Sequence, residues 1–571
     1  MIVRVACAAL HGVDAFRVDL EVDLARQGMP AFVMVGLAEG ALRESRERVF
    51  AAMRACNLRL PPARITVNLA PADRRKSGSG FDLPLAIGLL AAAEILPQGS
   101  TDGWFLLGEL SLTGELKPVP GVLPVAVRAR AEGARGMLVA ADNAAEAAVV
   151  EGLPVYPVRS LGEAAAFLAG QADISAVPSG GRAVWERGAD WPVDFAEVKG
   201  QEHAKRAIEI AAAGAHNLLF IGPPGSGKTM LAQRIPTVLP PLSFEEALEV
   251  TTIYSVAGQL DGQGLITRRP FRAPHHTVSD YGLVGGGANP RPGEISLAHR
   301  GVLFLDELPE FRKTALEVMR QPLEDGVVTI ARAAVSLTYP ADSMLVAAMN
   351  PCPCGYRTDD RHTCTCLGPA VQRYRARLSG PLLDRIDLHV EVPAVPYEDL
   401  RGGMTGSTSA EMRGRIATAR AVQSARYAGT PCRTNADLTG KLLEEHCALG
   451  PDEHAFLEGA VRALALSARA YTRILRIART IADLEWAEQA EQAGRVELAE
   501  QALAAGLDAV PGGAAGTAVP DAVLPDDAVA RGTDPAGGDA PSARPMGPAG
   551  PIRVQHLAEA INCRALDRER L

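Results

Sequence analysis

One eight-residue segment constrains the fold of this chain more than any other feature. The run Gly222-Pro223-Pro224-Gly225-Ser226-Gly227-Lys228-Thr229 directly follows a short apolar stretch, Leu218–Ile221, and precedes a helical pattern. Glycines let successive backbone N–H groups converge on phosphate oxygens, and the positive end of the following helix attracts the same anion. This order of strand, glycine-rich loop and helix is that of a phosphate-binding loop. We therefore expect an α/β domain in which Lys228 reaches the β- and γ-phosphates of ATP and the Thr229 hydroxyl ligates Mg²⁺.

A second segment has the form of the acidic element that accompanies such a loop. The apolar run Val302–Leu305 ends in Asp306 and Glu307. Taken alone, this pattern is often only a strand that leaves the core. Its position downstream of the glycine-rich loop favours a catalytic interpretation, in which Asp306 holds Mg²⁺ through water and Glu307 polarises the attacking water.

Three more side chains are candidates for contact with the γ-phosphate. Asn350 ends the apolar run Met344–Met349 and fits a sensing position, although an asparagine before proline also favours a turn. Phosphoryl transfer needs positive charge where the bond breaks. Arg385 and Arg469 are candidates for that charge, although an isolated arginine is usually a solvated surface residue.

The pattern along the chain divides it into several parts, since 571 residues exceed a single core. Residues 1–172 alternate short β-rich runs with helical stretches, and residues 173–194 have the composition of a linker. Residues 195–395 alternate apolar strands with helices, which predicts a parallel sheet. Residues 396–571 are mainly helical, apart from an Ala/Gly/Pro/Asp-rich insertion at about 504–551, where we expect disorder.

Several long strings resemble the magnesium-chelatase-like AAA+ ATPases of the ComM/YifB type. They occur in the same order as in that family and comprise Phe271–Thr277, Gly285–Gly287, Pro292–Ile295, Gly301–Leu308, Ala347–Gly355 and Leu378–Arg385. The resemblance implies a P-loop AAA+ parallel-sheet core with a C-terminal helical lid. It also implies a homo-hexameric helicase that promotes branch migration of DNA during natural transformation. By the same resemblance Arg385 is an arginine finger that acts on a neighbouring subunit, and Arg469 is the sensor-2 arginine.

The N-terminal part resembles the Lon-type protease fold, most clearly at Lys76–Leu83 and Gly108–Gly114. Active members of that family carry a serine and a lysine at positions that here fall on Gly78 and Leu123. Without a lysine to accept the hydroxyl proton there is no activated nucleophile. We therefore expect an inactive Lon-protease-like α/β domain with a role in DNA binding or ring assembly.

The nine cysteines are unevenly spread, and four of them lie close together. The cluster of Cys352, Cys354, Cys364 and Cys366 offers enough thiolates for a closed tetrahedral Zn²⁺ site, and His362 is a possible substitute ligand. Within each pair a single residue separates the two cysteines, whereas most zinc sites have at least two residues between them. Ordinary reduced cysteines or a redox role are the alternatives.

The indications of a DNA partner are indirect. The net charge of −9 is unfavourable for nucleic acid, but ten acidic residues lie between Trp486 and Pro551, so local basic loops remain available. The Val327–Tyr339 stretch alternates like a hairpin, and Arg332 near its middle is a candidate for phosphate contact in a central channel. For the His275-His276 pair we expect simple loop packing.

Other functions are weighed against the helicase. A magnesium-chelatase motor subunit shares the core pattern but lacks the long domain before the glycine-rich loop, and a protein remodeller is excluded by no residue. The sequence shows no signal peptide and no apolar stretch of membrane-spanning length. We therefore expect a cytoplasmic protein with no membrane partner.

Overall fold

The computed structural model describes residues 2–27, 29–36, 40–76, 78–188, 190–260, 262–287, 290–332, 335–359, 361–401, 406–492, 550–564 and 566. The chain forms two compact units. The first unit comprises residues 1–193, 241–357 and 363–385, and the second comprises residues 194–240, 358–362 and 386–571. The insertion predicted at about 504–551 lies outside the described residues except for its last two positions. Among the helices of the described ranges, none is both long and apolar enough to cross a bilayer.

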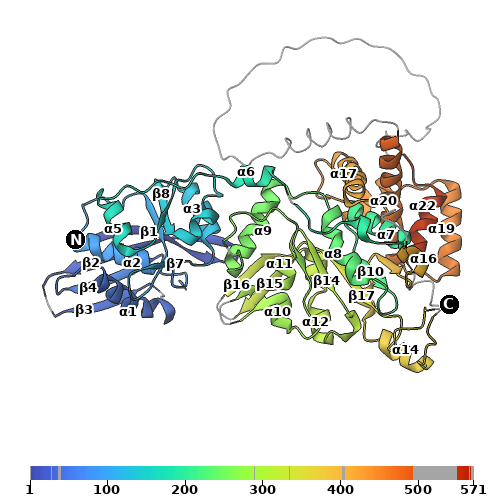
Figure 1. The fold of residues 1–571 in the computed structure, drawn as a ribbon, viewed down its shortest axis with the longest axis horizontal. Helices are drawn as coiled ribbons and strands as arrows, with labels where there is room; N and C mark the ends of the chain where they lie inside the picture. The colour runs from blue at the N-terminus through green and yellow to red at the C-terminus, as the bar shows by residue number, and fades with distance from the viewer. Residues whose placement is uncertain are drawn as a thin grey trace, which may run out of the picture. The chain divides into compact units, whose positions relative to one another are not determined.

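The first unit begins with a seven-stranded mixed sheet in the order β3-β4-β2-β1-β5-β8-β9 (Figure 1). Strands β1 and β2 form a hairpin through the pair His11–Asp14, while β5, β8 and β9 run parallel. The strand bounds are β1 Ile2–His11, β2 Asp14–Ala25, β3 Ala31–Val35, β4 Arg64–Ala70, β5 Trp104–Leu107, β8 Gly136–Ala140 and β9 Val155–Val158. The alternation of strands and helices expected for residues 1–172 is therefore present.

Hydrophobic cores cover both faces of this sheet. Successive residues of β5 point to opposite faces, so that Leu106 joins one core and Leu107 the other. The first core contains α1 (Gly40–Ala55), α2 (Asp82–Ala92) and α5 (Leu161–Leu168), and the second contains α3 (Val122–Ala131) and α9 (Phe244–Ala257). Every residue of α2 is buried. Gly88 allows the helix to lie close to the sheet, because a Cβ atom at this position would lie only 2.9 Å from Val22.

The positions that correspond to the Lon-type catalytic pair have clear structural roles. Gly78 has a φ of +98°, a conformation that glycine adopts without strain. Leu123 is completely buried in the second core, and its backbone N–H donates to Glu146 at 2.9 Å.

The segment expected to be a linker is more structured than its composition suggests. It contains a short helix, α6 (Gly181–Glu186). The indole of Trp185 in this helix donates to the carbonyl of Leu242 at 2.7 Å and lies edge-on to Phe244. Together with the bond from the N–H of Val177 to the carbonyl of Val155 at 2.8 Å and the packing of Arg182 over Phe244, this contact orders a stretch whose glycines and prolines predict a loop.

The first unit continues with three parallel strands and a hairpin. Strand β14 (Val302–Leu305) pairs with β11 (Phe271–Arg272) and with β17 (Met344–Met349). All residues of β14 and β17 are buried, as expected for a parallel sheet covered on both faces. The predicted hairpin is present as β15 (Val327–Arg332) and β16 (Val335–Pro340).

The second unit combines two parallel strands with a set of helices. Strand β10 (Leu218–Ile221) pairs with β18 (Leu388–Glu391). The helices include α7 (Glu202–Gly214), α8 (Lys228–Val238), α17 (Ser409–Arg426), α18 (Gly440–His446), α19 (Pro451–Ala463), α20 (Ala468–Gln492) and α22 (Val554–Asn562). Helix α17 packs on α7, α8 and α20, and α20 also packs on α7 and α22. The helical C-terminal part expected from the sequence is therefore present.

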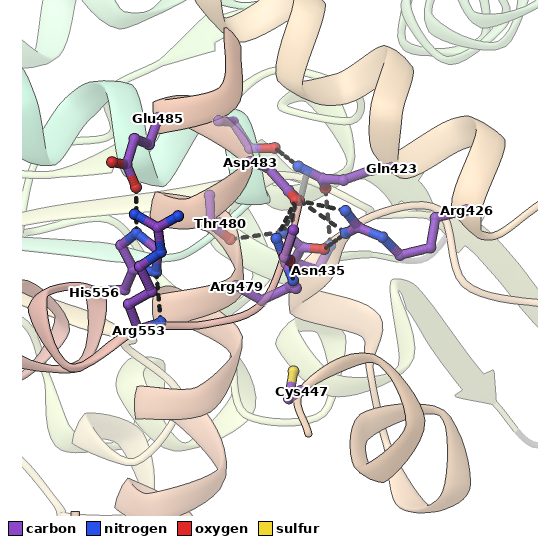
Figure 2. Close-up of polar contacts among 12 residues, drawn as sticks. Gln423, Arg426, Asn435, Cys447, Arg479, Thr480, Asp483, Glu485, Arg553 and His556 are labelled. Atoms are coloured by element: carbon purple, nitrogen blue, oxygen red, sulfur yellow. Dashed lines mark hydrogen bonds and ion pairs between the residues drawn. The ribbon is translucent and has the colours of Figure 1, made fainter. Parts of the chain in front are cut away.

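A buried polar network holds these helices together (Figure 2). At its centre the carboxylate of Asp483 in α20, completely buried, accepts two hydrogen bonds from Arg426 of α17, at 2.5 and 2.9 Å. Asn435, in the turn between α17 and α18, and Arg479 donate to the same carboxylate at 2.9 and 3.2 Å. Burial opposes the charge of Arg426, but its bonds to Asp483 raise the pKa of the guanidinium above its ordinary value.

Candidate nucleotide site

The glycine-rich loop of the second unit has the backbone geometry of an anion cradle. It joins β10, which is completely buried, to α8, which begins at Lys228. Gly225 and Gly227 have φ angles of +75° and +93°. At Gly222 a Cβ atom would lie 2.1 Å from the carbonyl oxygen of Val392, so that only glycine fits there. Three glycines are thus required by the conformation of the loop itself.

The side chains of the loop fit a phosphate ligand. The Lys228 amine is buried and donates to the carbonyls of Gly222 and Pro223 at 2.7 and 2.9 Å, so it lies across the mouth of the loop. The hydroxyl of Ser226 is buried, and within the described residues it has no hydrogen-bond partner. A buried unpaired hydroxyl costs free energy unless a ligand satisfies it. Thr229, in the first turn of α8, is exposed and accessible to a metal ion.

Lid elements belong to the same unit as this loop. Thr237 of α8 donates to Ser409, the first residue of α17, at 2.8 Å. The Asp194 carboxylate lies at the start of α17, where it accepts hydrogen bonds from the backbone N–H groups of Ala196 and of Ser409. Arg469 is exposed in the first turn of α20, which packs on α17.

The acidic element lies at the carboxyl end of β14 in the first unit. The Asp306 carboxylate accepts the backbone N–H of Glu307 at 2.9 Å, and Glu307 has a left-handed φ of +52°. This unusual backbone directs a half-exposed carboxylate away from the strand. Asn350 follows the parallel neighbour β17, so Asp306, Glu307 and Asn350 share one edge of this sheet. The backbone N–H of Asn350 also donates to the hydroxyl of Tyr374.

One contact of the acidic element was not expected from the sequence. The Nδ1 atom of His276 lies 3.2 Å from the Oε2 atom of Glu307. The neighbouring His275 instead contacts the hydroxyl of Thr277 at 2.9 Å. The rings of His275 and His276 lie 4.1 Å apart, and that of His276 lies edge-on to Phe311, so the expected loop packing is present and the contact with Glu307 adds to it. The contact with Glu307 arises because His276 follows β11 and Glu307 follows its parallel partner β14.

The remaining predicted residues are placed as follows. Arg385 follows the short helix α15 (Gly380–Leu383), donates to the carbonyl of Pro381 at 2.8 Å and forms an ion pair with Glu324. Arg332 is the last residue of β15 and pairs with Val335 across the hairpin. The four cysteines lie together in the first unit, whereas the imidazole of His362 is hydrogen-bonded to Asp359 in the second.

Family models match most of the described chain. The model of the magnesium chelatase subunit ChlI matches residues 194–400, a second ChlI model matches residues 20–143, and the model of the ChlI C-terminal part matches residues 406–501. The competence protein ComM of Haemophilus influenzae is 45% identical over 487 residues, which cover 84% of this chain and 93% of that protein. The chain belongs to the ComM/YifB family.

Other relatives agree with this assignment. The protein YifB of Salmonella typhimurium is 43% identical over 482 residues, which cover 84% of this chain and 93% of that protein. Lon protease 2 of Bacillus subtilis is 27% identical over 144 residues, which cover 24% of this chain and 26% of that protein. The predicted α/β fold, with Lon-like and magnesium-chelatase-like AAA+ parts and C-terminal helices, is thereby confirmed. Membership of this AAA+ family suggests ATPase activity and implies ATP and Mg²⁺ as ligands.

Proposed function

We propose that this chain is a Mg²⁺-dependent ATPase that moves DNA strands, acting as a homo-hexameric branch-migration helicase of the ComM type. The observation that carries the ATPase assignment is the glycine-rich loop, with its two positive φ angles and the buried hydroxyl of Ser226, which has no partner in the part of the chain that the structure describes. The match to the competence protein ComM along nearly its full length supports the DNA assignment.

The chain provides a residue for each requirement of phosphoryl transfer to water. Lys228 and the backbone N–H groups of Gly222–Thr229 bind the phosphates, and Thr229 and Asp306 would hold Mg²⁺. When bound there, the ion would supply positive charge to the phosphate oxygens. Glu307 orients and polarises the attacking water, with its carboxylate held by His276.

The γ-phosphate is contacted in this proposal by Asn350, by Arg469 of the same chain and by Arg385 of a neighbouring subunit. Arg385→Ala then abolishes hydrolysis while ATP affinity changes little. Mixing inactive Arg385→Ala subunits with inactive Lys228→Ala subunits restores activity, because one kind supplies the site and the other the finger. If co-assembled mixtures recover no ATPase at any ratio, Arg385 does not act on a neighbour.

Two other functions share the ATPase but differ in the partner. The chelatase family models support a chelatase-like motor subunit, and a protein remodeller has the same core requirements. ATPase rates with and without forked or four-way DNA distinguish them. Stimulation by DNA is expected for the helicase, whereas a hexamer indifferent to every DNA form contradicts it.

The hairpin β15–β16 is our candidate for the DNA contact. In this proposal Arg332 binds phosphate in a central channel, so its contact is independent of base sequence. Arg332→Ala is expected to weaken binding equally across sequences and to leave basal ATPase intact. The slope of log affinity against log salt concentration is expected to fall by about one unit for each phosphate that the variant no longer neutralises. Unchanged DNA affinity in this variant removes Arg332 from the site.

A further inference from the structure

Four cysteines gather in the segment between β17 and helix α14 (Gly368–Arg375) of the first unit. Their Sγ atoms all lie within 4.8 Å of one another. The first pair, Cys352 and Cys354, is brought together by a tight turn in which the N–H of Gly355 donates to the carbonyl of Cys352 at 3.0 Å. Gly355 has a φ of +88°, which ends this turn and directs the chain away from the sulfur atoms.

The three sulfur separations among Cys352, Cys354 and Cys364 are close to the edges of a tetrahedron around one metal ion, and Cys366 completes the group within 4.8 Å. Cys352 lies 3.4 Å from Cys354 and 3.7 Å from Cys364, and Cys354 lies 3.6 Å from Cys364. A zinc–sulfur bond is ~2.3 Å long, and a tetrahedron of such bonds has sulfur–sulfur edges of ~3.8 Å. A disulfide needs ~2.05 Å, and all four cysteines are free thiols. Sulfur atoms within 4.8 Å of one another suit the ligands of a single ion.

The surrounding backbone is suited to negatively charged sulfur. The N–H of Cys354 donates to the Sγ atom of Cys366 at 3.3 Å. The N–H groups of Tyr356 and Thr365 donate to the Sγ atom of Cys354. Four thiolates around a divalent ion leave two excess negative charges, which such donors stabilise.

We propose that Cys352, Cys354, Cys364 and Cys366 bind one Zn²⁺ ion in a closed structural site. All four ligands come from the protein, so no position remains for water or substrate, and the ion has no catalytic step. The described residues between 351 and 367 form neither helix nor strand. Loops longer than about 12–15 residues without secondary structure are uncommon, and a metal cross-link would hold this one in a single conformation, since the free energy of metal binding contributes to folding. The ion would hold in place the segment that follows Asn350. It would also hold helix α14, whose Tyr374 contacts the backbone of Asn350.

Metal analysis of the purified hexamer or monomer tests this site without reference to ATPase activity. Protein purified without chelator is expected to contain about one zinc ion per chain by mass spectrometry of the metal. Replacing the ion with Co²⁺ is expected to give the charge-transfer and ligand-field absorption of tetrahedral cobalt thiolate. Iron in place of zinc at the same stoichiometry, or no bound metal together with four thiols that alkylate rapidly, overturns the proposal.

A pair of variants assigns the ion to these residues. The double variant Cys364→Ser with Cys366→Ser is expected to lose the bound zinc. Cys56→Ser, a partly buried cysteine of the first unit outside the cluster, is the matched control and retains it. Zinc content that is equal in the double variant and the control contradicts the assignment. Should the double variant fold poorly, alkylation of the wild type provides the answer, since zinc protects the four thiols until a chelator is added.

Discussion

Replacing Asp483 tests the packing of the second unit most directly. Its carboxylate is completely buried, and the side chains of Arg426 and Arg479 that surround it are each only 6% exposed. In Asp483→Asn the charge disappears, and the new amide N–H₂ group faces donors instead of acceptors (Figure 2). Removing one partner of a buried ion pair costs about 3–5 kcal/mol, because the remaining charge is left without compensation.

This destabilisation has a measurable size and a matched control. For a unit of roughly 150–250 residues each kcal/mol shifts the melting temperature by about 2–4 °C, so a shift of about 6–20 °C is expected. The control is Glu458→Gln, which breaks the ion pair of Glu458 with Arg462 on the surface of α19. Both of its side chains are more than half exposed, and such pairs contribute about 0–1 kcal/mol.

The assay must report on one unit, because a chain with several cores does not unfold in a single step. Hydrogen exchange measured on peptides of α17 and α20 provides this resolution. Protection is expected to fall in both helices of Asp483→Asn and to remain in the N-terminal sheet. If α17 and α20 of this variant exchange no faster than in Glu458→Gln, the network does not hold the helices together.

Four further predictions concern the site and its surroundings. Lys228→Ala is expected to weaken ATP binding, whereas Glu307→Gln keeps binding but stops turnover; normal steady-state ATPase in Glu307→Gln would refute its role. His276→Ala is expected to lower kcat roughly ten- to a hundredfold with little change in the KM for ATP, because the imidazole positions the carboxylate of Glu307, and an unchanged kcat would refute this role. Glu324→Gln frees Arg385 from a partner whose carboxylate is 66% exposed, so ATPase rises by no more than about fivefold, and a complete loss would mean that the pair itself is needed. The hydrogen bond from His299, with the charge of Arg300, lowers the pKa of Glu249 to about 2. Its carboxylate therefore stabilises the fold fully at pH values above the ordinary pKa of a glutamate and loses this effect as the pH falls toward 2. In acid unfolding followed against pH, Glu249→Gln is expected to lack this contribution.

The sequence predicted those parts of the fold that short segments determine. The strand before Gly222, the helix from Lys228 and the strand before Asp306 each follow from a few adjacent residues, and the structure contains all three. The predicted hairpin of Val327–Tyr339 was found for the same reason, since alternation is a local pattern. The segment at 173–194 was harder because its helix is held by contacts with distant residues, among them Trp185 with Leu242 and Arg182 with Phe244.

Contacts between distant segments could not be predicted from one sequence. Glu324 and Arg385 are separated by 61 positions, and His276 and Glu307 lie in the segments that follow two strands, β11 and β14, whose pairing is visible only in the fold. The network around Asp483 draws on three separate helical segments. Each of these acidic and basic residues has the sequence appearance of a solvated surface charge, and only burial distinguishes Asp483 from Glu458.

The packing of the second unit links the lid to the phosphate loop through one short series of contacts. Helix α8 carries Lys228 at its start and contacts α17 through Thr237 and Ser409. Helix α17 is joined at its other end to α20 by Arg426 and Asp483. Since Arg469 lies in the first turn of α20, the helix with the proposed sensor arginine and the helix with the proposed phosphate lysine both pack on α17. A change at Asp483 should therefore affect ATP affinity as well as stability, whereas Lys228→Ala should leave the exchange of α17 and α20 unchanged. A parallel loss of protection in Lys228→Ala would show instead that the loop and the lid fold as a single cooperative element.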